Sequence, residues 1–354
     1  MLGAASRWIS PSVAVFAIAC TGSTAATGAA PAEAGGATPP EADAGWEAGC
    51  AEPGMLCYDL GPLDVPPGSE WQGFAAIDVG NAEDLAITGM EIDQVGALSH
   101  HFIVSLWNET APPPLGGPYE LFTPEGLSFV NSAVGSTLVG SVFKYVHIDN
   151  GRYVGVTLPA HAYLVNNAHY LNLGTDPAAG HTRVRIHTVP KDQVRFATIN
   201  ALPGNSQISV PPGQTGTVEG TWAPPSDGAV LLLTSHMHRH GRLFEIWQSV
   251  SGVETKIYST TSYDSPPLDI RTGSADAPLV VLRQATGDHL RFACTFENDD
   301  LTTDLVYGPS ALTNEMCVMP VYYVTEPDAL LALIAAGDGG QGFSWTVVPN
   351  GPGP

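Results

Sequence analysis

The chain has 354 residues, with 35 acidic side chains against 13 basic ones and a formal net charge of −22. This acidic excess excludes nucleic acid as an expected partner, because phosphate contacts require lysine and arginine. It favours solubility and identifies no substrate. Glycine and proline are abundant, at 39 and 30 copies, and helical periodicity is nearly absent. Short apolar runs between turn residues therefore predict an all-β fold built from antiparallel sandwiches of the jelly-roll class.

Residues 1–20 have the pattern of a secretory signal. Arg7 precedes an apolar stretch from 13 to 19, and small residues lead into Cys20. Ala17-Ile18-Ala19-Cys20 resembles a bacterial lipobox, with Ala17 where leucine is usual. There Cys20 would be lipidated and would anchor the protein in the cell envelope. A membrane-spanning anchor is the alternative, but the apolar run is short for a span and Pro11 interrupts it.

Residues 21–49 contain mainly alanine, glycine, threonine, proline and glutamate, so we expect a flexible tether without a core. From residue 50 onward the sequence has the texture of strands and turns. The stretch from 200 to 210, followed by Pro211-Pro212-Gly213, reads as the crossing between two domains. We therefore expect an N-terminal domain over 50–205 and a C-terminal domain over 206–354.

Apolar and alternating runs give the expected strands in chain order. They cover residues 71–79, 85–92, 102–107, 162–172, 184–189, 229–233, 243–247, 279–282, 290–296 and 318–324. One helix is expected over 328–336, where Asp328 can cap the apolar run that follows.

Five cysteines divide into one lipid candidate and four others. Cys50 and Cys57 are close enough to close a small loop, and Cys294 and Cys317 would close a larger one. Export would place them in an oxidising compartment, where disulfides persist. Free thiols or a cysteine metal site are the alternatives, and no Cys-x-x-Cys spacing supports the latter.

The segment Ser235-His236-Met237-His238 follows the apolar run 229–233, which is typical of a buried strand. Residues i and i+2 of a strand point to the same side, so His236 and His238 can present two imidazoles to one metal ion. Imidazole suits copper, zinc, iron and nickel. Two ordinary surface or core histidines are the alternative.

Three further segments accompany this pair in a fixed order. They are Ser99-His100-His101-Phe102, Ala168-His169-Tyr170-Leu171-Asn172, and Gly287-Asp288 with Cys294 and Glu315-Met316-Cys317. In this order, over roughly residues 55–325, the chain resembles the copper type II, ascorbate-dependent monooxygenases, which include peptidylglycine- and dopamine-hydroxylating enzymes. Phe102 stands where that family has methionine.

The resemblance implies two tandem jelly-roll domains, each with one copper on facing inner surfaces. His100, His101 and His169 would bind the electron-supplying copper. His236, His238 and Met316 would bind the copper at which oxygen is activated. The family disulfide maps onto Cys294–Cys317.

The residue types suit that chemistry. A soft thioether such as Met316 favours Cu(I), the form that binds oxygen. Two coppers held apart can each store one electron, and ascorbate would supply electrons singly. The adjacent pair His100-His101 predicts a bulge or a strand end, because neighbours in a regular strand face opposite ways.

The remaining histidines are expected to have no metal role. His240 is the nearest candidate, but Gly241 suggests that the strand ends there; the others are His147, His161, His181, His187 and His289. Val318 and Pro320 stand where the peptide-amidating branch has peptide-holding residues. A peptide substrate is therefore not supported, and the substrate stays open.

The sequence is compatible with three functions. The first is an exported two-copper monooxygenase that hydroxylates a C–H bond of a small substrate with O2 and ascorbate or another one-electron donor. The second is a surface lipoprotein that binds copper without turnover. The third is a double jelly-roll binding module that has lost its metals, which six retained ligands disfavour.

Overall fold

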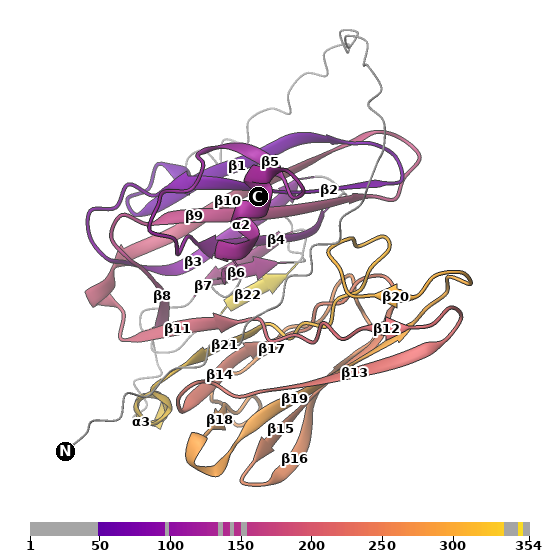
Figure 1. The fold of residues 1–354 in the computed structure, drawn as a ribbon. Coiled ribbons are helices and arrows are strands. Elements are labelled where there is room, and N and C mark those ends of the chain that lie inside the picture. The colour runs from indigo at the N-terminus through magenta and orange to yellow at the C-terminus, as the bar shows by residue number, and fades with distance from the viewer. Residues whose placement is uncertain are drawn as a thin grey trace, which may run out of the picture. The chain divides into compact units, whose positions relative to one another are not determined.

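A computed structural model describes residues 49–95, 99–133, 137–141, 145–149, 154–335 and 346–349 (Figure 1). The expected signal, the lipobox at Cys20 and the tether up to residue 48 lie outside the described residues. Residues 336–345 and 350–354 also lie outside them.

The first half of the described chain, joined by the C-terminal strand β22, forms two facing β-sheets. One has the strand order β1-β10-β3-β8, with β7 and β22 beside it, and the other has the order β5-β2-β9-β4-β6. The bounds are β1 Met55–Val65, β2 Ser69–Asp78, β3 Leu85–Val95, β4 Ser99–Leu106, β5 Gly116–Glu120, β6 Thr137–Ser141, β7 Tyr145–Asp149, β8 Val154–Leu158, β9 Tyr163–Asn172, β10 Ala178–Pro190 and β22 Thr346–Pro349.

The second half repeats this arrangement. One sheet continues in the order β11-β21-β14-β17, with β18 beside β14, and the other has the order β13-β19-β15-β16. A short pair, β12 with β20, stands apart. The bounds are β11 Phe196–Ala201, β12 Ser209–Val210, β13 Thr215–Trp222, β14 Gly228–Leu233, β15 Gly241–Val250, β16 Val253–Thr260, β17 Asp269–Ile270, β18 Val280–Leu282, β19 His289–Glu297, β20 Leu305–Val306 and β21 Val321–Val324.

Strands β1 to β4 alternate between the two facing sheets of the first half, and β13 to β15 alternate in the same way in the second, as in a jelly roll, whereas β15 and β16 form a hairpin within one sheet. Strands β1 and β3 lie in one sheet, while β2 and β4 lie in the other. The long pairs are antiparallel, and their inward side chains are apolar. The protein is therefore all-β, with two antiparallel jelly-roll sandwiches, and the predicted fold class is confirmed.

One pairing joins the two sandwiches. Strand β11 pairs in parallel with β8 and antiparallel with β21, so a single sheet runs from the first half into the second. The main hydrophobic core also contains residues from both halves, among them Val154, Phe196, Leu231 and Leu330. Residues Asp43–Pro354 form one compact unit, so the division at residues 205 and 206 stays a prediction.

The helices are short. They are α2 (Pro124–Ala133), α3 (Pro327–Ala335) and the 3-10 turns η1 (Lys191–Gln193) and η2 (Gln284–Thr286). Helix α3 was expected to start at Asp328 as its cap, but it begins at Pro327. Asp328 lies in the first turn and pairs with Arg283 instead. None of the helices in the described residues is long and apolar enough to cross a membrane.

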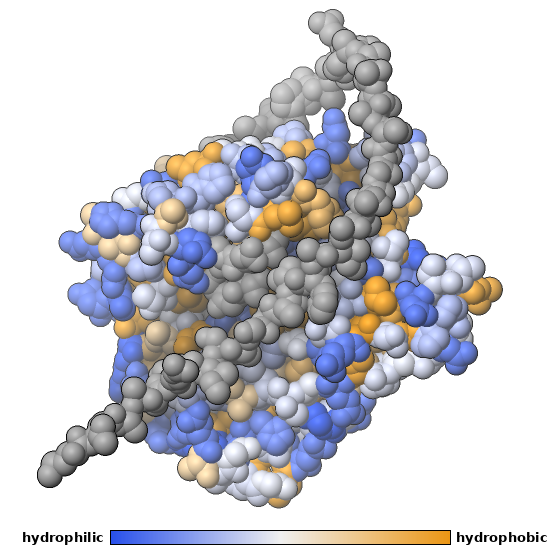
Figure 2. Space-filling view, viewed as in Figure 1, coloured by the Kyte–Doolittle hydropathy of each residue, from blue (hydrophilic) through white to orange (hydrophobic). Residues whose placement is uncertain are grey.

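Two disulfides confirm the predicted cysteine pairs. Cys50 is bonded to Cys57 at the entrance to β1, and Cys294 of β19 is bonded to Cys317. The two disulfides are compatible with an exported protein. Hydrophobic and hydrophilic residues are interspersed over the described surface in the view of Figure 2. Single exposed apolar side chains, such as Phe122 and Leu301, are ordinary on a protein surface.

Candidate metal centre

His236 and His238 lie beyond the end of strand β14, which stops at Leu233. The expectation that they lie in a continuing strand is therefore wrong in detail. His236 instead forms an isolated antiparallel bridge with Val318, in which each backbone N–H bonds the other carbonyl, at 2.9 and 3.1 Å. This extended conformation still brings the two imidazoles together, with ring centroids 5.3 Å apart.

His100 and His101 lie at the start of β4, where the pairing with β9 shifts register. Ser99 pairs with Tyr170 and His101 pairs with His169, which leaves His100 as the extra residue between them. The predicted bulge at this pair is confirmed. A bulge re-aims one side chain, and here it lets both imidazoles approach His169.

These five histidines lie in a single cluster. The His100 ring centroid is 5.3 Å from that of His101 and 4.9 Å from that of His169. It is also 5.4 Å from the ring of His236 and 5.0 Å from that of His238. Two sets of three have nitrogens within 4.8 Å of one another: His100, His236 and His238, and His100, His101 and His169.

The sequence led us to expect two copper sites held apart on facing domains. The histidine sets are contiguous instead, and the ring of His101 lies 5.7 Å from that of His236. Residues of β4 and β9 thus meet the segment after β14. Packing of the two sandwiches against each other determines this contact, and no local pattern in the sequence encodes it.

Hydrogen bonds identify which ring nitrogens are available to a metal. His101 Nε2 donates to Asn167 Oδ1 at 2.8 Å, and His169 Nε2 donates to Glu70 Oε2 at 2.9 Å. His238 Nδ1 donates to the carbonyl of Asn314 at 3.0 Å. Since these oxygens only accept, the opposite nitrogen of each ring holds a lone pair.

Those opposite nitrogens are buried without a hydrogen-bond partner among the described residues. They are Nδ1 of His101, Nδ1 of His169 and Nε2 of His238, and Nε2 of His100 has the same character. Buried polar atoms without partners are costly and uncommon. Four such atoms facing one cluster therefore fit a bound metal ion.

Burial favours the neutral form of His100, His101, His236 and His238, the form that metal ligation requires. Burial, followed by repulsion from neighbouring imidazoles, lowers the pKa of His101 to about 3. The same causes lower the pKa of His100 and of His236 well below the usual histidine range. Burial lowers the pKa of His238 to about 4.

The segment that carries Met316 is tied to this cluster through Glu315. The Glu315 carboxylate is buried and accepts the backbone N–H groups of His238 at 2.9 Å and His240 at 2.7 Å. It also accepts the N–H of Met316 at 3.3 Å. Burial raises the pKa of Glu315 to about 7. Glu315 therefore holds the His236–His238 segment against the segment before Cys317.

The other histidines whose side chains the structure describes lie outside the two triads. His240 is buried, and its Nδ1 lies 2.9 Å from Asp299 Oδ1 rather than toward the cluster. His181 and His187 lie near Asp59 and Glu91, and His289 Nδ1 lies 3.0 Å from the Gly287 carbonyl. The side chain of His147 lies outside what the structure describes. The expectation that none of these binds the metal stays a prediction.

Sequence reasoning missed Glu70. It lies in β2, where an acidic residue in an alternating strand reads as solvent-facing. Its Oε2 accepts both His169 Nε2 and the backbone N–H of Ala311, each at 2.9 Å. Burial alone would raise the pKa of Glu70, but hydrogen bonds from His169 and Ser310 outweigh burial and lower it. No local sequence signal identifies this residue.

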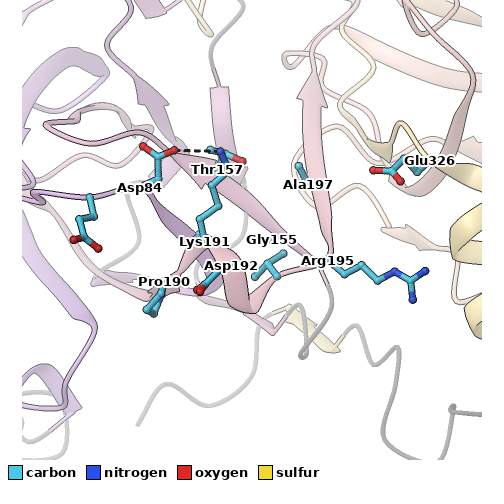
Figure 3. A pocket seen from close by; sticks show the side chains of 12 residues that line it. Asp84, Gly155, Thr157, Pro190, Lys191, Asp192, Arg195, Ala197 and Glu326 are labelled. Atoms are coloured by element: carbon cyan, nitrogen blue, oxygen red, sulfur yellow. Dashed lines mark hydrogen bonds and ion pairs between the residues drawn. The ribbon is translucent and has the colours of Figure 1, made fainter.

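A pocket of about 630 Å³ lies elsewhere, along β3, β8, η1 and β11 (Figure 3). Asp84, Lys191 and Arg195 line it, and Lys191 pairs with Asp84 at 3.2 Å. Pro190, the last residue of β10, also lines the pocket. Thr182 of the same strand bonds the hydroxyl of Tyr170, which follows His169 in sequence. Pro190 and Thr182 are roughly 25 Å apart along the strand. None of the five clustered histidines lines this pocket.

No protein-family model and no curated protein matches the chain. Among solved structures, the chain is similar to the major capsid protein P2 of bacteriophage PM2, at 10% identity over 77% of this chain and 97% of that one, with a TM-score of 0.33. It is similar to the STIV MCP at 11% identity over 78% and 99%, with a TM-score of 0.30. PNGase F from Flavobacterium meningosepticum gives 10% identity over 77% and 96%, with a TM-score of 0.31.

Proposed function

We propose that this protein is an exported copper-dependent monooxygenase that hydroxylates a C–H bond of a small substrate. The observation that supports it best is the histidine cluster, in which buried lone-pair nitrogens from segments far apart in the sequence come together. The resemblance to the copper type II monooxygenases over the same residues supports copper as the metal. Ascorbate or another one-electron donor would supply the electrons.

Five histidines and Met316 would hold two copper ions per chain. His100, His101 and His169 form one set, and His236, His238 and Met316 form the other. Bound copper would supply the one-electron redox chemistry that O2 activation requires. In each turnover one oxygen atom enters the substrate C–H bond and the other leaves as water, which consumes two electrons and two protons.

The surrounding residues orient these ligands. Asn167 fixes the His101 ring, and Nδ2 of the same amide donates to the carbonyl of Gly73 at 3.0 Å. Glu70 fixes the His169 ring, and the carbonyl of Asn314 fixes that of His238. Such outer partners set ring orientation and raise ligand basicity. The burial of His101, His169 and His238 also limits the access of water.

Export is part of the proposal. Residues 1–20 would direct secretion, and lipidation of Cys20 would anchor the mature chain in a bacterial cell envelope through the tether 21–49. The Cys50–Cys57 and Cys294–Cys317 disulfides are compatible with that location.

The test is oxygen incorporation by copper-loaded protein. Purified protein with ascorbate is incubated with a panel of small substrates under ¹⁸O2, and products are analysed by mass spectrometry. We expect a product with one ¹⁸O atom, and loss of that product in His238→Ala. His289→Ala is the matched control, because His289 lies outside the cluster. Ascorbate oxidation without labelled product across the panel would contradict the monooxygenase proposal.

Copper binding without turnover is the second candidate function. The pocket of Figure 3 contains none of the clustered histidines, as a copper carrier without a substrate site would allow. A copper carrier predicts metal binding and retention without any labelled product.

A further inference from the structure

His100 occupies the centre of the histidine cluster. Its ring lies within 5.4 Å of the rings of His101, His169, His236 and His238. The bulge that leaves it unpaired between Ser99 and His101 explains this position. His100 belongs to both histidine triads, whereas His101 and His238 each belong to only one.

A neutral imidazole offers one lone pair to a metal. Nε2 of His100 is buried without a hydrogen-bond partner among the described residues, so it is the nitrogen available inside the cluster. Imidazole nitrogens bind first-row ions at about 2 Å. One nitrogen therefore completes one three-imidazole site at a time, while the other set is left with two imidazoles.

We propose that His100 is a shared ligand for which the two metal positions compete. Cu(II) then has one tight site of three imidazoles, formed with His101 and His169 or with His236 and His238. A second Cu(II) binds more weakly, because it lacks the third imidazole. This differs from two independent sites, and it rests on copper binding in the proposed function but not on turnover.

Cu(II) is the probe that separates these arrangements, because the Met316 thioether is a soft ligand that favours Cu(I). With Cu(II), binding strength depends mainly on the number of imidazoles. Apoprotein is titrated with Cu(II) against a competing chelator, and bound metal is counted by elemental analysis. We expect one tight step and a second step weaker by about tenfold or more.

Variants give the sharper result. His101→Ala leaves one complete triad and His238→Ala leaves the other, so each single variant keeps the tight step within about threefold. His100→Ala removes a ligand from both triads and should weaken the tight step by at least about tenfold. The double variant His101→Ala/His238→Ala should behave like His100→Ala, although His100 itself is present.

The controls address folding. Melting temperatures of the apoproteins are compared, and His100→Gln keeps a polar side chain without an imidazole. His289→Ala should leave both steps unchanged. Two equally tight Cu(II) sites in the parent protein, or a tight step that survives in His100→Ala, would overturn the shared-ligand proposal.

The same titration separates this proposal from the proposed function. Tight and weak Cu(II) steps without any ¹⁸O-labelled product would leave the shared ligand standing and remove the monooxygenase. Labelled product with two equally tight sites would do the reverse. The absence of tight copper binding in the parent protein would contradict both.

Discussion

Glu70 Oε2 lies 2.9 Å from Nε2 of His169. The same oxygen accepts the backbone N–H of Ala311, from the segment that leads to Met316. One carboxylate in the first sandwich therefore orients a candidate metal ligand and also fixes a loop of the second. Since the contact spans more than two hundred residues of sequence, only the folded chain reveals it.

Glu70→Ala should weaken Cu(II) binding only where His169 completes the tight site. In a His238→Ala background we expect about a tenfold loss of affinity, the usual effect of removing a ligand's hydrogen-bond partner. In a His101→Ala background the tight site does not use His169, so the affinity should hardly change. Chelator competition measures both. An equal loss in the two backgrounds would show that Glu70 acts on overall stability instead.

Met316 should respond differently to two substitutions. Met316→His should still bind copper, because imidazole is a good copper ligand, yet lose most turnover, because the thioether that favours Cu(I) is gone. Met316→Ile should weaken Cu(I) binding while its melting temperature changes little, since the volume is similar. Copper content, melting temperature and ascorbate-driven oxygen uptake distinguish these effects.

Met319→Ile is the matched control for Met316. Met319 is fully buried in the core of the second sandwich, so its replacement should alter stability and leave copper content unchanged. If both Met316 variants bind two coppers and turn over like the parent, Met316 is not a ligand.

The Cys294–Cys317 disulfide should affect stability and metal binding together. It closes a separation of 23 residues next to Met316, so replacing both cysteines with alanine should lower the free energy of unfolding by about 3 kcal/mol. Cu(I) binding should weaken as well. The Cys50–Cys57 pair, at a separation of 7, is the matched control and should leave Cu(I) binding intact. Mass spectrometry of unreduced peptides checks the pairing first.

Asp288 should make the protein more stable above pH 4 than below it. Its buried carboxylate accepts the N–H groups of Ser251 and Arg283 and the Thr286 hydroxyl. Burial raises its pKa, but these hydrogen bonds outweigh burial and lower it. A lowered folded-state pKa contributes stability above the unfolded value of about 3.9, and this contribution is lost as the pH falls through the folded value.

Asp288→Asn should remove that pH dependence. The new amide N–H would face a backbone donor, so the free energy of unfolding at neutral pH should fall by about 1–3 kcal/mol. Urea unfolding between pH 2.5 and 7 measures both effects, with the exposed Asp276→Asn as the control. A parallel pH profile for Asp288→Asn and the parent would contradict the assignment.

Much of the fold could be predicted because strand signals are local. Alternation at residues 71–79 and 85–92 predicted β2 and β3, and adjacent histidines at 100 and 101 predicted the bulge. The helix boundary at Asp328 was less accurate, because a following apolar run does not reveal that Arg283 pairs with that carboxylate.

The candidate site was only partly predictable. The six candidate ligands were named from residue order, but the common location of the five histidines depends on how β4 and β9 meet the segment after β14. His236 and His238 were expected on a strand, whereas the bridge to Val318 holds the first of them. Glu70 and the carbonyl of Asn314 have tertiary roles that a pattern along one strand cannot reveal.

The parallel pairing of β8 with β11 also bears on how the chain could be divided. Phe196 of β11 packs in one core with Val154 of the first sandwich and Leu231 of the second. A gene fragment that ends before residue 196 would leave β8 with an open edge and its core without Phe196 and Leu231. We expect that neither this N-terminal fragment nor the complementary C-terminal fragment accumulates as a stable product when expressed alone. Co-expressed halves should reassociate through the shared sheet.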